Sequence, residues 1–95
     1  MENAISVSQL NRYIKDLISS DYNLKNITLK GEISNFTNHI KTGHFYFTLK
    51  DEYSSIRAIM FKGNASKVKF EVENGMNVIV TGSVQVFERD GVYRP

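Results

Sequence analysis

The strongest constraint in this sequence is a two-residue hydrophobic period that begins at Ile27 and recurs along the chain. Successive side chains of a β-strand point to opposite faces, so this period predicts strands with one buried face. It predicts four strands, over residues 27–36, 44–50, 55–61 and 76–87. Glycines interrupt two of these apolar series, at Gly31 and Gly82. Glycine inside a strand is typical of a close backbone approach or a bend, which favours a sheet that curves around a barrel.

A helical period precedes the strands. Apolar residues spaced three and four apart share one face of this predicted helix, namely Leu10, Tyr13, Ile14, Leu17 and Ile18. Ser6 and Gln9 have the spacing of a capping box, and Ser8 is the alternative N-cap. A polar run over residues 19–23 is expected to end the helix.

Weaker signals complete the predicted fold. Residues 62–70 break the alternation and predict a short helix or turn, and Asp90-Gly91 predicts a turn before a fifth strand at Val92. This order of elements favours a mainly β fold with an N-terminal helix, the OB-fold, a five-stranded Greek-key barrel with a short helix between its third and fourth strands. A two-layer α+β sandwich is the alternative.

The fifth predicted strand begins only a few residues before the chain ends at Pro95. We therefore expect an OB-fold whose last strand is truncated, with a helical segment over residues 1–22 and an incomplete OB-fold domain over residues 23–95. An unfinished barrel leaves strand edges unpaired. We expect either an open edge or strand exchange between copies, which would give a strand-exchanged homo-oligomer.

Composition and charge exclude several kinds of site. The chain has no cysteine, so a disulfide, a thiolate zinc site and a cysteine nucleophile are excluded. It has no apolar run of the kind a secretory signal or a bilayer span requires, so we expect a cytoplasmic protein without membrane contact. Residues 30–69 hold seven basic and three acidic residues, and the flanks hold five basic and seven acidic. This basic middle hints at a polyanion-binding face, although lysines scattered over a solvated surface are the simpler interpretation.

Catalytic chemistry has little support in the sequence. The carboxylates fall in predicted turns and connections, where none faces another as an acid opposite a base. These are Asp51, Glu52, Glu71, Glu73, Glu88 and Asp90. His39 and His44 flank a loop but have neither a cysteine nor a nearby carboxylate to complete a metal site. We expect no catalytic residue, no metal site and no cofactor in this chain.

Binding is better supported, because aromatic and basic residues interleave on the outward sets of the first three predicted strands. The aromatics are Phe36, Tyr46 and Phe61, and the cations are Lys30, Lys50 and Arg57. Rings on a solvent face can stack on unpaired bases while cations neutralise phosphates, as in single-stranded nucleic acid binding. The competing interpretation is that Phe36 and Phe61 cover the barrel ends or pack on the first helix.

Four segments carry a more specific resemblance. They are residues 7–11, 31–36, 43–51 and 60–65, with the sequences VSQLN, GEISNF, GHFYFTLKD and MFKGNA. In order and spacing they resemble the N-terminal end of the bacterial exodeoxyribonuclease VII large subunit, and the resemblance runs from about Val7 to Tyr93. It implies a non-catalytic barrel that presents single-stranded DNA to a nuclease region further along the parent polypeptide. It also implies that the parent hydrolase degrades single-stranded DNA from either end into oligonucleotides and assembles with copies of a small subunit.

The resemblance also implies a DNA surface. Its expected members on and beside the strands are Lys30, Phe36, His44, Tyr46, Lys50, Arg57, Phe61 and Lys62. Arg89 and Tyr93 are expected to flank the cleft from the last loop, although Glu88 and Asp90 weaken the phosphate contact expected of Arg89. The alternative function is a docking or assembly domain of the same nuclease complex, with an aromatic face that packs on protein and little DNA affinity.

Overall fold

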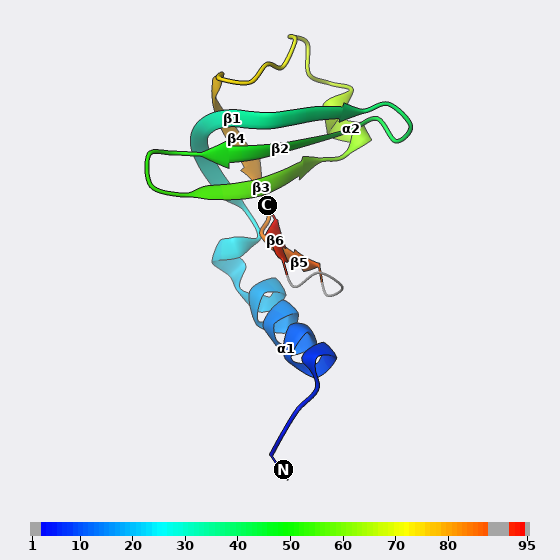
Figure 1. Ribbon diagram of the computed structural model, residues 1–95, viewed down its shortest axis with the longest axis vertical. Coiled ribbons are helices and arrows are strands. Elements are labelled where there is room, and N and C mark those ends of the chain that lie inside the picture. Colours follow the sequence, from blue (N-terminus) through cyan, green and yellow to red (C-terminus); the bar gives the residue numbers. More distant parts are fainter. Residues whose placement is uncertain (1–2, 88–91, 95) are drawn as a thin grey trace.

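The computed structural model describes residues 3–87 and 92–94, and it shows a curved β-sheet from which one long helix extends (Figure 1). The helices are α1 (Val7–Ser20), the 3-10 turn η1 (Tyr22–Leu24) and α2 (Lys62–Ala65). The strands are β1 (Ile27–His39), β2 (His44–Lys50), β3 (Ser55–Met60), β4 (Asn77–Gly82), β5 (Gln85–Phe87) and β6 (Val92–Arg94). The short helix predicted between the third and fourth strands is therefore present as α2.

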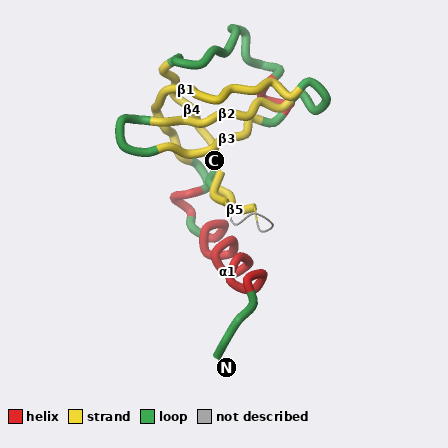
Figure 2. The backbone as a smooth tube through the Cα atoms, viewed as in Figure 1, coloured by secondary structure: helices red, strands yellow, loops and turns green. Residues whose placement is uncertain are grey.

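Four strands form one antiparallel sheet in the order β3-β2-β1-β4, and β5 and β6 form a separate antiparallel pair. The β1–β2 and β2–β3 turns lie at opposite ends of this sheet (Figure 2). Within the described residues, β6 lies beside β3 without pairing with it. The described sheet is therefore open, with β3 and β4 at its edges.

The core lies on one face of this sheet, at the positions that the two-residue period predicts. Ile33, Phe47, Leu49 and Ala58 are buried there. The half-buried apolar residues packed around them are Leu29, Phe36, Phe45, Ile56, Met60, Val72, Met76, Val78 and Val80. The side chains that alternate with the core on β1, β2 and β3 make up the opposite face, which we term the outer face.

Gly31 is required by a close approach between β1 and β2. A Cβ atom at this position would lie 2.8 Å from Leu49 Cγ and 2.9 Å from the backbone O of Lys50. Contacts this short do not occur for real side chains, so only glycine lets the two strands approach here. The close approach predicted at Gly31 is confirmed, and Gly82 ends β4 where the chain leaves the sheet.

Helix α1 begins with the capping box that the sequence predicts. The Ser6 hydroxyl accepts a hydrogen bond from the Gln9 N–H, and Gln9 Oε1 accepts one from the Ser6 N–H, at 3.0 and 2.8 Å. Helix α1 contacts β5 and projects away from the sheet, so the β5–β6 pair lies between the helix and the sheet (Figure 1). Ile14 and Ile18 are half-buried, whereas the rest of the apolar stripe, Leu10, Tyr13 and Leu17, is exposed.

A β-bulge at Asn35 corrects the prediction that Phe36 faces outward. The β1–β2 register shifts between Ser34 and Thr37, and Asn35 has a left-handed backbone with φ 52°. One extra residue reverses the facing of every residue after it. Phe36 therefore lies against the core, with its ring edge-to-face with Phe45 at 5.1 Å between centroids. The Asn74 side-chain oxygen accepts a hydrogen bond from the Phe36 N–H at 2.9 Å and holds the bulge in place.

The single long strand predicted over residues 76–87 is also wrong. The chain leaves the sheet after Gly82, and Ser83 and Val84 separate β4 from β5. The Val84 N–H donates a hydrogen bond to the Leu24 carbonyl at 2.8 Å, so this segment is held by η1 instead of by β1. The first strand, predicted over residues 27–36, is longer in the structure, because β1 continues to His39.

Candidate nucleic-acid interface

The outer face of β2 and β3 is built by cross-strand pairs whose register places polar and aromatic side chains together. Tyr46 lies opposite Ile59 and Thr48 lies opposite Arg57, each between core residues of its own strand. A shallow hollow of ≈ 350 Å³ opens there, bordered on its outer side by Asn35, Tyr46, Thr48, Arg57 and Ile59. The bulge at Asn35 therefore shapes the outer face as well as the core.

Four rings meet at the end of this face nearest the β1–β2 turn, and we term them the ring cluster: His39, His44, Tyr46 and Phe61. Tyr46 lies in the middle, with ring centroids 6.0 Å from His39 and 6.4 Å from His44. His44 in turn meets Phe61 edge-to-face at 5.1 Å. Phe61 remains exposed, so the cluster presents aromatic surface to solvent and does not fill a core.

His44 also fixes the start of α2. Its Nδ1 accepts a hydrogen bond from the Lys62 backbone N–H at 2.9 Å. Because Nδ1 accepts, the neutral ring carries its proton on Nε2. The Lys62 side chain packs along Gly43 of the β1–β2 turn, since a Cβ at Gly43 would lie 3.1 Å from Lys62 Cγ. The geometry thereby places a lysine and the Phe61 ring beside His44, whose own ring lies 6.4 Å from that of Tyr46.

The outer face continues toward the β2–β3 turn, where charges replace rings. Lys50 lies opposite Glu32, and the two side chains form a salt bridge of 3.5 Å. Lys30, two residues before Glu32 on β1, is exposed and lies opposite the exposed Ile79 of β4. We term Lys30, Glu32 and Lys50 the charged end. Its net positive charge is reduced because Glu32 offsets Lys50.

The structure thus brings together five of the residues expected at a DNA surface and separates the others. The five are His44, Tyr46, Arg57, Phe61 and Lys62. Lys30 and Lys50 lie at the charged end, and Phe36 lies in the core. Arg89 lies outside the described residues, and Tyr93 is described only as backbone in β6, opposite Val86.

The alternating sequence pattern did not predict several residues that belong to this surface. His39, Asn35, Thr48 and Ile59 border the ring cluster or the hollow, although none was expected at a binding surface. Thr48 and Ile59 could have been found by extending the alternation across the strand pair. His39 could not, because its facing depends on the bulge at Asn35.

Asp51 belongs to a turn. Its Oδ1 accepts hydrogen bonds from the backbone N–H groups of Tyr53 and Ser54 at 2.8 and 2.9 Å. These bonds, that of Tyr53 first and that of Ser54 second, stabilise the carboxylate and lower the pKa of Asp51 below its ordinary value of 3.8. The carboxylate therefore stays ionised in the β2–β3 turn, which does not suit a general acid.

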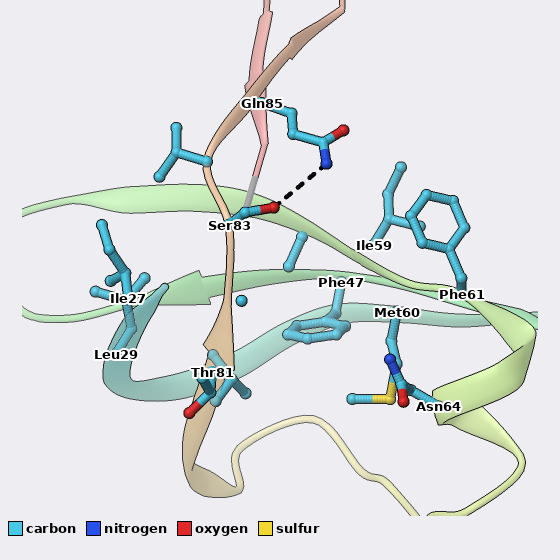
Figure 3. A pocket seen from close by; sticks show the side chains of 14 residues that line it. Ile27, Leu29, Phe47, Ile59, Met60, Phe61, Asn64, Thr81, Ser83 and Gln85 are labelled. Carbon is cyan, nitrogen blue, oxygen red and sulfur yellow. Dashed lines mark hydrogen bonds between the residues drawn. The ribbon is translucent and has the colours of Figure 1, made fainter. Parts of the chain in front are cut away.

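An apolar trough lies between the edge strand β3 and the end of β4, and Phe61 of the ring cluster is among the residues that line it (Figure 3). It encloses ≈ 400 Å³. Apolar side chains dominate its lining, with Ile27, Leu29, Phe47, Met60, Val80 and Val84 among them. At one rim the Gln85 side-chain amide donates a hydrogen bond to the Ser83 hydroxyl at 3.3 Å (Figure 3). Such a lining suits another apolar strand better than a polar ligand.

Residues 3–87 and 92–94 contain no group of three or more histidine, aspartate or glutamate side chains placed to hold a metal ion. In the same residues, no helix combines the length and apolar character needed to cross a membrane.

The open antiparallel sheet, the short helix after β3 and the exposed ring cluster together define the class of protein to which this chain belongs. The chain belongs to the OB-fold nucleic acid binding domain family, which matches residues 5–94. The mainly β OB-fold predicted from the sequence is thereby confirmed, and the sandwich alternative is wrong.

Individual relatives agree with the resemblance seen in the sequence. The chain is 50% identical over 94 residues to the exodeoxyribonuclease 7 large subunit of Ruminiclostridium cellulolyticum, covering 99% of this chain and 23% of that protein. It is 56% identical over 90 residues to the same subunit of Clostridium acetobutylicum, covering 95% and 22%. The Bacillus cereus subunit is 51% identical over 90 residues, covering 95% and 20%. The chain thus spans less than a quarter of the length of these relatives.

Proposed function

We propose that this chain binds single-stranded DNA across the outer face of β2 and β3, with Tyr46 and Arg57 at the centre. The observation that carries the proposal is the gathering of the ring cluster beside Arg57 on one exposed strip of the sheet. In OB-folds the second and third strands supply the surface that binds oligonucleotides. Tyr46 and Phe61 would stack on bases, and Arg57 and Lys62 would neutralise phosphates.

Unpaired DNA fits this surface better than a duplex does. Stacking on Tyr46 requires a base with a free face, which a duplex does not offer. Reading a duplex through its major groove needs a helix or a two-stranded ribbon that enters the groove. The ring cluster instead lies on the face of a sheet, and among the described residues Arg57 takes part in no ion pair that would compete with a phosphate.

The names of the relatives support a role for this chain within a larger enzyme. Because they are named as exodeoxyribonuclease large subunits, the chain would serve as a non-catalytic DNA-binding module of such a subunit. The parent enzyme would degrade single-stranded DNA from either end into oligonucleotides, together with the exodeoxyribonuclease VII small subunit, in the cytoplasm. Residues 23–95 would form the DNA-binding domain, with residues 1–22 as a helical segment beside it. The module itself would need no cofactor.

Titration of a labelled single-stranded oligonucleotide at two salt concentrations tests the proposal. Tyr46→Ala should weaken binding by about ten-fold or more, because each stacked base contributes roughly 1–3 kcal/mol. Arg57→Ala should lower the slope of log affinity against log salt by about 0.7, the value for one lost phosphate contact on a single strand. The matched controls are Tyr53→Ala in the distant β2–β3 turn and Lys25→Ala beside α1, and both should bind like wild type.

Two outcomes would exclude the DNA surface. One is the absence of wild-type binding at millimolar protein, and the other is equal binding by wild type and all four variants. An aromatic surface that packs on protein should show little dependence on salt, whereas phosphate contacts weaken steeply as salt rises. The salt dependence therefore separates DNA binding from the alternative docking role.

The apolar trough favours a second role, in assembly. It runs beside the edge of β3, which is unpaired among the described residues, so an extended apolar segment could fill the trough and pair with that edge. We propose strand exchange between two copies of this chain as the source of that segment. Multi-angle light scattering over a range of protein concentrations should then detect a dimer. A strictly monomeric chain at every concentration would exclude strand exchange.

A further inference from the structure

The β1–β2 turn presents an apolar side chain that the DNA surface described above does not use. The turn comprises residues 40–43, between the end of β1 and the start of β2. Ile40 is 90% exposed, the largest value for any large apolar side chain in the described part of the molecule. It is the one apolar side chain of this described turn, whose other residues are Lys41, Thr42 and Gly43.

Hydrogen bonds hold this turn in one shape. The N–H groups of Thr42 and Gly43 both donate to the His39 carbonyl, at 3.2 and 2.7 Å. The Thr42 hydroxyl lies 2.9 Å from His39 Nδ1 and accepts a hydrogen bond from the His44 N–H at 3.2 Å. Gly43 adopts a φ of 77°, which a residue with a Cβ rarely takes. The turn thus holds the backbone around Ile40 in one conformation, so binding there would cost little backbone ordering entropy.

Ile40 adjoins the ring cluster along the chain. His39 directly precedes it, and the His39 ring lies 6.0 Å from that of Tyr46. The side chain of Lys62 packs on Gly43 at the end of the same turn. A strand of DNA that stacks on Tyr46 and continues past His39 would therefore meet Ile40 next, with Lys41 beside it to contact a phosphate.

We infer that Ile40 is a wedge that inserts between two successive bases of the single strand bound on the ring cluster. This inference rests on the proposed function. Apolar side chains that enter base steps unstack the bases, and an unpaired strand has no partner strand to resist the opening. The wedge sets the register of the strand at the edge of the ring cluster, because it separates the base on Tyr46 from the next one.

Nucleic acid fits the exposed Ile40 at the tip of the β1–β2 turn better than a protein partner does. A protein-docking surface needs a contiguous apolar patch, and single apolar side chains on a surface do not form one. The residues next to Ile40 in the chain are instead a histidine, a lysine and a threonine. A lone apolar group among cationic and polar side chains suits a ligand that alternates flat apolar bases with phosphates.

The test uses an oligonucleotide that carries 2-aminopurine, whose fluorescence rises when neighbouring bases unstack. Wild type should brighten the probe on binding. Ile40→Ala should bind about five-fold more weakly, because the apolar contact with the bases is lost, and should brighten the probe less. Its salt slope should be unchanged, since no phosphate contact is removed. Ile40→Leu should restore both affinity and fluorescence.

The matched control is Ile79→Ala, which removes an exposed isoleucine from β4 on the far side of the outer face. It should bind and brighten the probe like wild type. If Ile40→Ala also behaves like wild type while Tyr46→Ala is weakened, the wedge is wrong and the DNA surface stands. If wild type does not bind, the DNA surface and the wedge fail together. A change in self-association alone for Ile40→Ala, measured by light scattering, would assign the tip to a protein contact and overturn the inference.

Discussion

The two halves of β1 present different surfaces although one strand carries both. Before the bulge, residues 27–34 follow strict alternation, and their outer face bears the charged end, where Glu32 offsets Lys50. After the bulge, residues 36–39 have the opposite phase, and their outer face meets the ring cluster. The same sheet therefore offers paired charges at one end and exposed rings at the other.

This difference indicates that position on the sheet decides the value of a basic or aromatic residue for binding. Lys50 must give up or share an ion pair before it contacts a phosphate. Arg57 has no such partner among the described residues, and it adjoins the hollow at the bulge. We therefore expect most of the binding energy for DNA to come from the end of the sheet that carries the ring cluster and Arg57, and less from the charged end.

The largest expected effect is on stability, and it distinguishes the core residue Phe36 from the outer-face residue Tyr46. Phe36→Ala should lower the free energy of unfolding by about 2–3 kcal/mol, because it empties space beside Phe45 in the core. Tyr46→Ala should change stability far less and reduce DNA affinity instead. Chemical denaturation and oligonucleotide titration of both variants check this double contrast.

Phe36→Leu is the companion variant, because it keeps most of the packing and folds more readily. It should bind the oligonucleotide like wild type. A loss of affinity in Phe36→Leu without a loss of stability would show that Phe36 contacts DNA, and that the separation of the two halves by the bulge is wrong.

The next largest effect is also on stability, and it concerns the close approach of β1 and β2 at Gly31, before the bulge. Gly31→Ala should destabilise the fold by about 1–3 kcal/mol, because the new methyl group would overlap Leu49 and the backbone of Lys50. The matched control is Gly63→Ala in α2, where a Cβ meets nothing within 4 Å. Alanine favours a helix over glycine, so Gly63→Ala should be neutral or stabilising. Equal destabilisation by both variants in thermal unfolding would contradict the close approach.

Much of the fold could be predicted from the sequence because burial imposes a period. The core positions Ile33, Phe47, Leu49 and Ala58 follow from alternation alone, and the Ser6–Gln9 capping box follows from spacing. The two-residue period no longer predicts which face a side chain lies on where a strand contains an extra residue or the chain leaves the sheet. The bulge at Asn35 and the break after Gly82 both depend on distant partners, the Asn74 side chain and the Leu24 carbonyl, which no local pattern reveals.

The binding site was less predictable than the fold for the same reason. Tyr46 and Arg57 lie on the regular strands β2 and β3, so their outward positions could be predicted. Phe36 and His39 lie after the bulge, and each faces the side opposite to the one that strict alternation gives. The neutralisation of Lys50 by Glu32 depends on register between two strands, which the sequence of either strand alone does not fix.

A smaller effect tests the charged end directly. Glu32→Gln removes the partner of Lys50 and should raise affinity for the oligonucleotide about two-fold at low salt, in line with the small energy of an exposed ion pair. The control Glu71→Gln makes the same change in net charge at an exposed position between α2 and β4. If the two variants raise affinity equally, Lys50 lies outside the path of the DNA and only net charge matters.

The smallest effect is on stability and concerns the β2–β3 turn, beyond the charged end. The folded state lowers the pKa of Asp51 through the N–H groups of Tyr53 and Ser54, so its carboxylate contributes stability that is fully present above about pH 3.8. That contribution should be lost as the pH falls further, through the lowered pKa of the folded state. Asp51→Asn should therefore have a flatter profile of unfolding free energy against pH in this range than wild type. Glu52→Gln, which neutralises the neighbouring carboxylate, is the control, because among the described residues Glu52 accepts no comparable hydrogen bond. A profile for Asp51→Asn as steep as that of Glu52→Gln would show that the turn does not depend on the Asp51 charge.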